Sequence, residues 1–305
     1  MRICSLLPSA TEILYALGLG DDVVGVSHEC DYPPDALRKP KVIRTLIDQD
    51  TRSSEEIDQE VHRSLERRES LYQVDAEALR RLHPDLIVTQ ELCDVCAIDA
   101  TQVSAALRAL SYQPDVISLH PHTLQEMLED IRLVGERVGH QAQAEELVAS
   151  YRRRIDQVQT RLAGISRRPR VFCLEWLAPP MATGHWVPEM VELAGGIEVL
   201  GRAGQPSRYA NAEEIVDARP EVLILMPCGF SIERTRRELA VVSAQPWWGR
   251  IPAVRDGQVH LVNGPAYFNR AGPRLIDGIE LLASVLHPDR CAGLLPAGAH
   301  AVAGL

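Results

Sequence analysis

Four cysteines of this chain are candidate metal ligands. Cys93 and Cys96 form a Cys-x-x-Cys motif, and Cys30 and Cys228 each follow a stretch that we predict to be a buried strand. Four thiolates can bind zinc tetrahedrally or hold an iron–sulfur cluster, so these residues indicate a candidate zinc or iron–sulfur site. Alternatively, one thiol or imidazole could be the axial ligand of a cobalt or iron ion. Two further interpretations stay open, a redox-labile pair and small apolar side chains that fill the core.

A second set of candidates consists of aromatic and polar side chains in loops. These loops follow predicted strands, and in α/β proteins the loops at the carboxyl ends of parallel strands meet the ligand. Rings can pack on an apolar ligand while carboxylates, an amide and an arginine bind its polar groups, so the set suits a large ligand of mixed polarity. The alternative is that the rings only close the ends of the sheets. The candidate ligand-binding residues are Pro8, Ser9, His28, Glu29, Cys30, Glu91, Cys93, Trp176, His185, Trp186, Tyr267, Phe268, Asn269 and Arg270.

Motifs of several enzyme classes are missing from the sequence. It has no Gly-x-Gly-x-x-Gly after a strand, no Walker loop, no His-Glu-x-x-His and no Gly-x-Ser-x-Gly. We therefore expect no catalytic residues and a protein that binds its ligand without converting it. The runner-up interpretation is an intracellular metalloprotein or enzyme that uses the four cysteines named above.

An internal repeat indicates how these loops are positioned. Residues 74–88 recur at 210–224, so that Glu77 matches Glu213 and Pro84 matches Pro220. Each copy predicts a short capped helix, a proline stop and a buried strand. A repeated helix-to-strand unit predicts two similar lobes, and a cleft between two lobes is a common place for a ligand.

Other elements repeat in the same order and extend this prediction. Strands are expected at 2–6, 23–27, 86–89, 170–174 and 222–225, and helices follow at 8–18 and 188–195. Ser9 is the expected N-cap of the first helix, with Glu12 completing a capping box. Alternation of strands and helices predicts an α/β protein with two Rossmann-like lobes, each a parallel sheet with helices on both faces.

The domain organisation follows from these elements. We predict an N-terminal α/β lobe at 1–122, connecting helices at 123–168, a C-terminal α/β lobe at 169–290 and a flexible tail at 291–305. The second connecting helix, at about 141–165, would be nearly 40 Å long at ~1.5 Å per residue, which favours a stiff connection. Residues 53–71 have no counterpart in the second lobe and predict an amphipathic surface helix.

Composition excludes several classes of protein. The chain has 305 residues and a net charge of −10, which argues against a nucleic-acid binder. No apolar run reaches the ~18 residues of a membrane span, so we expect no membrane insertion. The sequence begins Met-Arg-Ile-Cys-Ser and its seven cysteines are odd in number, which together predict a cytoplasmic protein, expected to be a monomer. The alternative is a periplasmic or other extracytoplasmic protein whose signal peptide has been removed.

Three segments carry a resemblance to a known family. Residues 5–13, 25–34 and 266–274 resemble the vitamin B12-binding proteins of ABC importers, and the resemblance extends over about 1–288. Those proteins belong to the helical-backbone class of periplasmic binding proteins (class III), whose members also carry siderophores and haem. The resemblance implies two lobes joined by a rigid helix, with cobalamin, another corrinoid or a related metal chelate bound between them. Glu29 stands where that family has a tyrosine, and Tyr267 to Arg270 stand in a loop that touches the corrinoid.

The resemblance also implies a protein partner. Members of the family dock to the permease of an ABC transporter through one exposed glutamate of each lobe. Glu77 and Glu213, which match one another in the internal repeat, stand at these positions. The alternative is that each glutamate only stabilises the start of its helix through the helix macrodipole.

Overall fold

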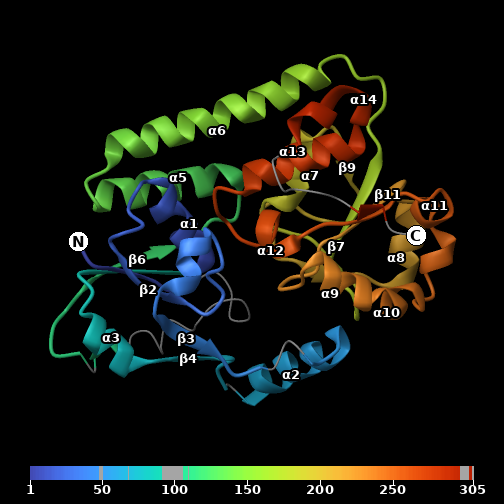
Figure 1. Cartoon of the computed structure of the whole chain (residues 1–305). Coiled ribbons are helices and arrows are strands. Elements are labelled where there is room, and N and C mark those ends of the chain that lie inside the picture. The colour runs from blue at the N-terminus through green and yellow to red at the C-terminus, as the bar shows by residue number, and fades with distance from the viewer. Residues whose placement is uncertain (48–50, 68, 91–105, 109, 296–301, 304–305) are drawn as a thin grey trace. The chain divides into compact units, whose positions relative to one another are not determined.

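The computed structural model describes residues 1–305 except 48–50, 68, 91–105, 109, 296–301 and 304–305 (Figure 1). The chain divides into two compact units, residues 1–121 with 125–149, and residues 122–124 with 150–305. The division falls inside the long helix α6 (Gln141–Leu162), whereas we predicted separate connecting helices at 123–168. Each unit contains one sheet with helices around it, as the α/β prediction requires.

The first unit is built on a six-stranded sheet in the order β4-β3-β2-β1-β5-β6. Its strands are β1 (Ile3–Ser5), β2 (Val23–Ser27), β3 (Lys41–Thr45), β4 (Tyr72–Val74), β5 (Leu86–Gln90) and β6 (Asp115–Leu119). Neighbouring strands are parallel except β3 and β4, which pair antiparallel. The prediction of a wholly parallel sheet is therefore wrong at this edge. The central strands β1 and β5 are apolar and buried, which is typical of parallel strands covered on both faces.

The described helices of this unit are α1 (Pro8–Ala16), α2 (Ser54–Arg67), α3 (Ala76–Leu82), most of α5 (Leu124–Arg137) and the first part of α6, with a 3-10 turn at Pro34–Arg38. The N-cap of α1 is Leu7, without a side-chain hydrogen bond, so the predicted cap at Ser9 is wrong. Pro8 begins the helix instead, because its fixed φ and missing N–H suit the first helical position. Gly18, with φ +81°, follows the end of α1.

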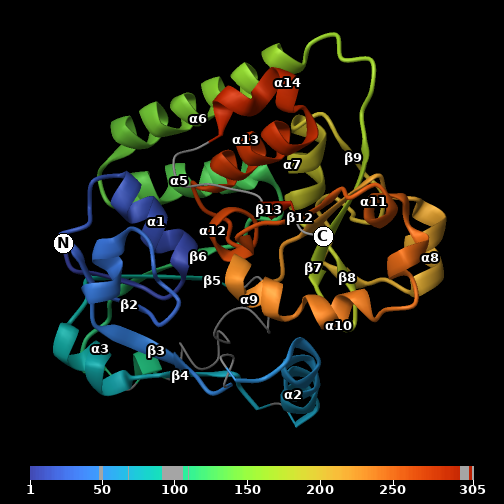
Figure 2. The same ribbon diagram turned by 45° about the vertical axis from the view of Figure 1, so that its right-hand side comes forward.

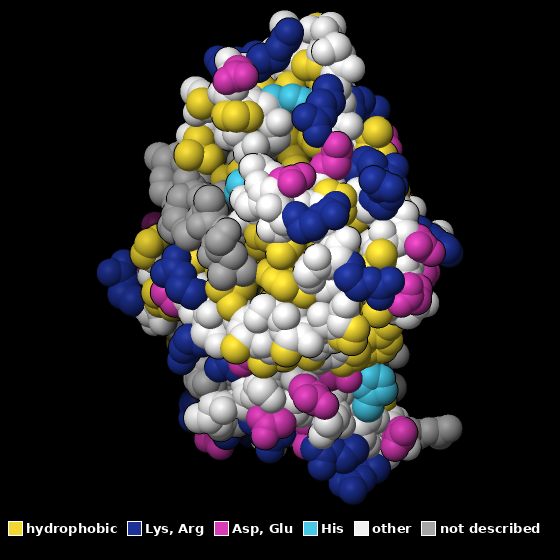
Figure 3. All heavy atoms as spheres, turned by 90° about the vertical axis from the view of Figure 1, so that its right-hand side faces the viewer, with side chains coloured by type: hydrophobic (Ala, Val, Ile, Leu, Met, Phe, Trp, Pro, Cys, Tyr) yellow, Lys and Arg dark blue, Asp and Glu magenta, His cyan; other side chains and the backbone are white. Residues whose placement is uncertain are grey.

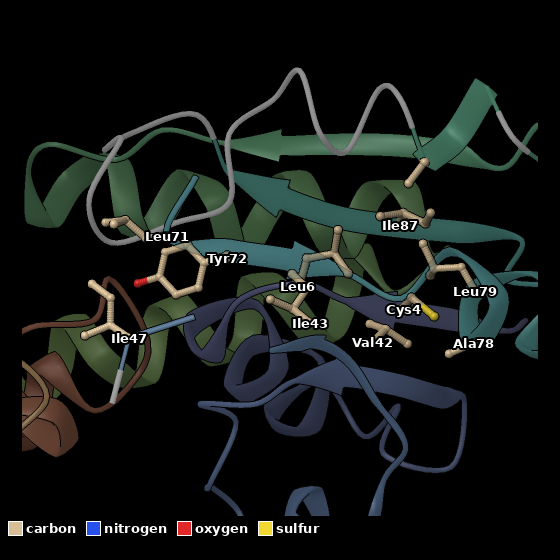
Figure 4. Close-up of a cluster of buried hydrophobic side chains, with 11 residues drawn as sticks. Cys4, Leu6, Val42, Ile43, Ile47, Leu71, Tyr72, Ala78, Leu79 and Ile87 are labelled. Carbon is tan, nitrogen blue, oxygen red and sulfur yellow. The ribbon is translucent and has the colours of Figure 1, made fainter. Parts of the chain in front are cut away.

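A cluster of buried side chains joins the sheet of the first unit to α3. Ala78 and Leu79 of α3 lie over Cys4 and Ile87 of the two central strands, as Figure 4 shows. Tyr72 of β4 extends the cluster toward the edge of the sheet. Helix α2 is present as predicted; Ile57 is 5% exposed and Leu65 is 41% exposed, so only part of its apolar face is covered.

Helix α5 and the first part of α6, residues 141–149, run side by side in both views (Figures 1 and 2). Gly135 permits this contact, because a Cβ there would overlap the Cβ of Ala144. Gly139, with φ +75°, makes the turn between the two helices. With 22 residues, α6 is about 33 Å long at ~1.5 Å per residue, which is somewhat shorter than predicted.

The second unit contains a sheet in the order β10-β8-β7-β11-β12-β13, with β9 also paired to β7. Its strands are β7 (Arg170–Trp176), β8 (Met181–Ala182), β9 (Ile197–Glu198), β10 (Arg208–Tyr209), β11 (Val222–Leu225), β12 (Val259–Leu261) and β13 (Val302–Ala303). Strands β9, β7, β11 and β12 form the parallel part. Strands β8, β10 and β13 pair antiparallel, so this sheet is mixed too.

Eight helices of the second unit are described in addition to α6. They are α7 (Val187–Leu193), α8 (Ala212–Ala218), α9 (Ile232–Arg237), α10 (Leu239–Ser243), α11 (Pro252–Arg255), α12 (Gly264–Tyr267), α13 (Leu275–Leu286) and α14 (Pro288–Cys291), with 3-10 turns at Trp248–Arg250 and Ala292–Leu294. Helix α13 lies beside α7 and along α6 (Figure 2), and Arg154 of α6 binds Glu280 and Asp277 of α13. Cys291, which we expected at the start of a flexible tail, is fully buried at the end of α14.

The internal repeat predicted from the sequence is present in the structure. The succession β1-α1-β2 of the first unit corresponds to β7-α7-β9 of the second, and α3-β5 corresponds to α8-β11. Asp75 caps α3 by accepting a hydrogen bond from the backbone N–H of Ala78, and Asn211 caps α8 in the same way through Glu214. The two units therefore share the capping of these helices as well as the order of their elements.

One set of contacts recurs almost unchanged, and we call it the strand-start clamp. In the first unit, Arg2 donates its backbone N–H to Asp85 (2.7 Å) and its Nε to the carbonyl of Leu82 (2.8 Å). In the second, Arg170 donates its backbone N–H to Glu221 (3.0 Å) and its Nε to the carbonyl of Ala218 (3.0 Å). Each clamp fixes the start of one central strand against the end of the helix that precedes its neighbour.

Candidate functional site

The first unit brings several predicted site residues to the carboxyl ends of its strands. Pro8 and Ser9 form the first turn of α1, where Ser9 is 5% exposed. His28 and Glu29 follow β2, with 3.8 Å between Nε2 of His28 and Oε1 of Glu29. The His28 ring also lies 5.7 Å from the ring of Tyr72. A polar group of a ligand could therefore meet an imidazole and a carboxylate together at this edge.

Cys30, which we predicted as a metal or ligand contact, is fully buried. Its sulfur lies 3.1 Å from Oγ1 of Thr11, which in turn lies 2.8 Å from Oγ of Ser5. This position favours the interpretation of Cys30 as a small core residue within a hydrogen-bonded network.

Of the remaining predicted ligands, the structure describes Cys228. Glu91, Cys93 and Cys96 lie outside the described residues. Cys228 is half-buried in the turn after β11, where its backbone N–H donates to the carbonyl of Glu175 at 3.0 Å. In the described part of the chain, no three histidine, cysteine, aspartate or glutamate side chains come together as a metal site. The four-thiolate site therefore stays a prediction.

In the second unit, Trp176 lies at the end of β7 next to two other side chains. Its ring centroid is 5.2 Å from that of Phe230, and the guanidinium of Arg234 lies 4.8 Å above the Phe230 ring. Trp176 is only half-buried, whereas Phe230 is 3% exposed. The Trp176 ring thus packs on the buried ring of Phe230 and presents a partly exposed apolar surface.

His185 forms a pair with His122 that the sequence did not predict. Their Nδ1 atoms are 3.3 Å apart and their rings are stacked with centroids at 5.4 Å. His185 has a left-handed backbone (φ +50°), fixed by a hydrogen bond from its N–H to the carbonyl of Gln205. Burial, and to a lesser degree His122, lower the pKa of His185, which favours the neutral imidazole. A neutral imidazole is the form that coordinates a metal.

Three predicted ligand contacts anchor the late loop instead. Trp186 is 5% exposed and donates its Nε1–H to the carbonyl of Phe268 at 2.7 Å, and Phe268 is 1% exposed. Asn269 donates its side-chain N–H to the carbonyl of Met226 at 3.2 Å. Tyr267 and Arg270 are only half-buried in the same loop. The three anchors hold the loop, and the partly exposed Tyr267 and Arg270 are the side chains that a ligand can meet.

The two predicted docking glutamates occupy equivalent places at the starts of α3 and α8. Glu77 is 72% exposed and lies 3.3 Å from Arg81 of the same helix. Glu213 is 68% exposed and receives two hydrogen bonds from Arg250, at 2.8 and 2.9 Å. These bonds lower the pKa of Glu213, so the carboxylate stays charged. Each unit therefore presents one exposed glutamate side chain at a matching helix start.

The sequence matches the family model described as periplasmic binding protein over residues 3–264. The chain belongs to the periplasmic binding protein family. The family resemblance inferred from the three loop segments is thereby confirmed, as is the class of fold with two α/β units and a long helix. No helix among the described residues of this periplasmic binding protein has the length and apolar character needed to cross a lipid bilayer.

Several relatives of this periplasmic binding protein cover nearly its whole length. A vitamin B12-binding protein of Vibrio cholerae serotype O1 is 27% identical over 291 residues, which are 93% of this chain and 88% of that protein. An uncharacterized ABC transporter substrate-binding lipoprotein of Bacillus subtilis, YvrC, is 27% identical over 297 residues, covering 94% and 80% of the two chains. The prediction of a cytoplasmic protein finds no support in these relatives, one of which is named a lipoprotein.

Solved structures show the same fold. The periplasmic vitamin B12-binding protein BtuF of Vibrio cholerae superimposes with a TM-score of 0.65 and 25% identity, covering 93% of this chain and 96% of its own. The periplasmic haem-binding protein RhuT of Roseiflexus sp. RS-1 superimposes with a TM-score of 0.68 and 21% identity, covering 94% and 98%.

Proposed function

We propose that this periplasmic binding protein binds a corrinoid or a related metal chelate without catalysis and presents it to the permease of an ABC transporter. The observation that carries the proposal is the similarity to the Vibrio cholerae vitamin B12-binding protein over 93% of the chain. We also propose that the protein works outside the cytoplasm, since relatives are named as periplasmic proteins or as a lipoprotein. Finding the native protein in the cytoplasmic fraction of its cells would contradict that location.

The partly exposed side chains at the carboxyl ends of the strands support a ligand of mixed polarity. The rings of Trp176 and Tyr267 would pack on the apolar parts of the ligand. Arg270 and Glu29 would bind its polar side groups. His185, kept neutral by burial, would be able to coordinate the metal of a chelate.

Titration of the purified protein with cyanocobalamin, cobinamide and haem tests this function, followed by absorbance and calorimetry. We expect saturable 1:1 binding of one of these ligands. Tyr267→Ala and Arg270→Gln should each weaken that binding at least tenfold, because each removes a contact worth about 1.4 kcal/mol or more. Tyr209→Ala, which removes a 42% exposed ring on β10, is the matched control and should change the affinity less than twofold. Absence of binding to all three ligands would refute the proposal.

Docking to the permease can be tested separately. We propose that Glu77 and Glu213 bind cationic residues of the permease, one glutamate from each unit. The double variant Glu77→Gln/Glu213→Gln should keep its ligand affinity and lose ligand-dependent stimulation of the transporter in proteoliposomes. Arg250→Gln releases Glu213 from its internal partner and should leave stimulation intact or raise it. Full stimulation by the double variant would exclude this docking mode.

A further inference from the structure

The second unit contains a large pocket at the amino ends of its strands, away from the loops of the candidate site. Its volume is about 810 Å³. It lies where β7, β11 and β12 begin, between α8 and α11. Figure 3 views the side on which α8 and α11 lie in Figure 1, and arginine or lysine side chains stand at several places on it. The charged and titratable side chains that line the pocket are Arg167, Arg170, Arg219, Arg255, Glu221, Asp256 and His287.

The charges of the pocket are unbalanced in favour of cations. Arg167 forms an ion pair with Glu221 at 2.7 Å, and Arg170 is bound through its guanidinium to the carbonyl of Ala218. Four arginines against two carboxylates leave an excess of two positive charges among the residues that line the pocket, His287 not counted. This excess stands out in a chain whose net charge is −10. A concave basic surface concentrates anions.

Arg219 and Arg255 are the two cations that are available to a ligand. Both are exposed, and no hydrogen bond or ion pair of either guanidinium is found within the described part of the chain. Arg219 also adopts a left-handed backbone (φ 46°) at the end of α8, a position that glycine usually occupies. A non-glycine residue in this region costs of order 1 kcal/mol, so the chain retains an arginine here at the expense of stability.

The internal repeat provides a comparison within the same chain. His83 corresponds to Arg219 and has the same left-handed backbone (φ 45°). In the first unit, however, the ring of Tyr112 stacks on His83 at 3.7 Å, and the Tyr112 hydroxyl donates to the carbonyl of Leu79. An aromatic side chain therefore covers this turn in one unit, whereas an arginine lines an open pocket at the same turn in the other. The basic pocket is thus a property of the second unit and not a necessary result of the fold.

We propose that this pocket binds an oxyanion of the phosphate class, either a polyphosphate or a phosphate ester. Guanidinium groups bind phosphate oxygens in bidentate fashion, and Arg219 and Arg255 would supply these contacts. Arg167 and Arg170 are held by their own partners and would contribute positive potential from fixed positions. The volume exceeds that of a single phosphate several-fold, which favours a diphosphate or the phosphorylated headgroup of a lipid over orthophosphate.

Calorimetric titration with pyrophosphate tests the pocket, in a buffer without phosphate and at low ionic strength. We expect 1:1 binding that weakens as KCl is added, since salt screens these charges. Arg219→Asn, which keeps a residue that tolerates the left-handed backbone, and Arg255→Gln should each weaken binding at least tenfold. Arg237→Gln removes an exposed arginine of α9 outside the pocket and should change affinity less than twofold. Circular dichroism would verify that all variants are folded.

Two results would overturn the proposal, namely no heat of binding at 1 mM pyrophosphate, or equal weakening by Arg237→Gln and the two pocket variants. A second arm of the experiment identifies the source of the anion. Sedimentation with phosphatidylglycerol vesicles that is lost in Arg219→Asn and competed by pyrophosphate would assign a lipid headgroup. Pyrophosphate binding without vesicle association would assign a soluble ligand. Affinity for the ligand of the candidate site should be unchanged in all these variants.

Discussion

Replacing Asp130 of α5 by asparagine should stabilise the protein at neutral and alkaline pH. Asp130 is 9% exposed, and its Oδ2 has no hydrogen-bond partner within the described residues. Burial first, and the charge of Glu126 second, raise its pKa from 3.8 to about 7. The folded protein therefore holds a proton between pH 3.8 and about 7 that the unfolded chain releases. Stability falls as the pH rises through this window, because the folded state binds more protons there.

The size of the effect follows from the shift in pKa. A difference of about three pH units corresponds to about 4 kcal/mol at ~1.4 kcal/mol per unit, of which roughly 2–3 kcal/mol falls between pH 5 and pH 8. Asparagine has the same shape and does not titrate, so this part of the pH dependence should vanish in Asp130→Asn. The variant should accordingly gain roughly 2–3 kcal/mol relative to wild type on going from pH 5 to pH 8.

Urea unfolding at pH 5, 6, 7 and 8, followed by circular dichroism at 222 nm, measures this difference. Fluorescence is less suitable, because all four tryptophans lie in the second unit whereas Asp130 lies in the first. Glu136→Gln makes the same chemical change at an exposed position of α5 and should run parallel to wild type. Parallel curves for Asp130→Asn and wild type would refute the reasoning, since they would mean that Asp130 is ionised in the folded protein at pH 5.

Three further predictions concern the second unit. Burial lowers the pKa of His185, so below about pH 6.5 this imidazole takes up a proton more readily in the unfolded chain than in the folded protein. The fall in Tm between pH 7.5 and pH 5.5 should therefore be smaller in His185→Asn than in wild type. An equal fall in the two proteins would contradict this. Arg154→Leu leaves Glu280, which is 8% exposed, without its partner, so the free energy of unfolding measured in urea should fall by about 3 kcal/mol. The double variant Arg154→Leu/Glu280→Leu should regain most of this free energy. Trp186→Phe keeps a ring but removes the hydrogen bond to the carbonyl of Phe268, so unfolding should become easier by about 1–2 kcal/mol; an unchanged urea midpoint would show that the bond is not needed.

The elements found from sequence were those with a strong local pattern. Strand β11 and the first three residues of β5 are continuous apolar runs, and the helices before them carry their caps in the sequence, so the repeat could be found directly. Strands β8, β10 and β13 have two residues each, which is too short for any periodicity. Cys291 was assigned to a tail because alanine and glycine follow it, but a hydrogen bond from Ser284 to its carbonyl and burial against α13 fix it.

Candidate site residues were harder to place, because sequence shows the loop but not the direction of each side chain. The loop at Tyr267 to Arg270 was found from the sequence. Phe268 and Trp186, however, are buried in the core, where Trp186 donates a hydrogen bond to the carbonyl of Phe268. His122 and His185 are 63 positions apart, and no local pattern connects them. A residue such as His185 in a left-handed conformation depends on the turn around it, which the sequence Gly-His-Trp alone does not reveal.

The strand-start clamp has a consequence for how the chain acquires its fold. Arg2 and Asp85 are 83 positions apart, Arg170 and Glu221 are 51 apart, and the two clamps are chemically alike. An unfolded chain can therefore pair Arg2 with Glu221 and bring β1 beside β11, a mistake of the kind that repeated domains make. On the ribosome, Asp85 emerges long before Glu221, so the order of synthesis selects the correct partner. Refolding from denaturant has no such order, and newly made protein should reach the native state in higher yield than refolded protein.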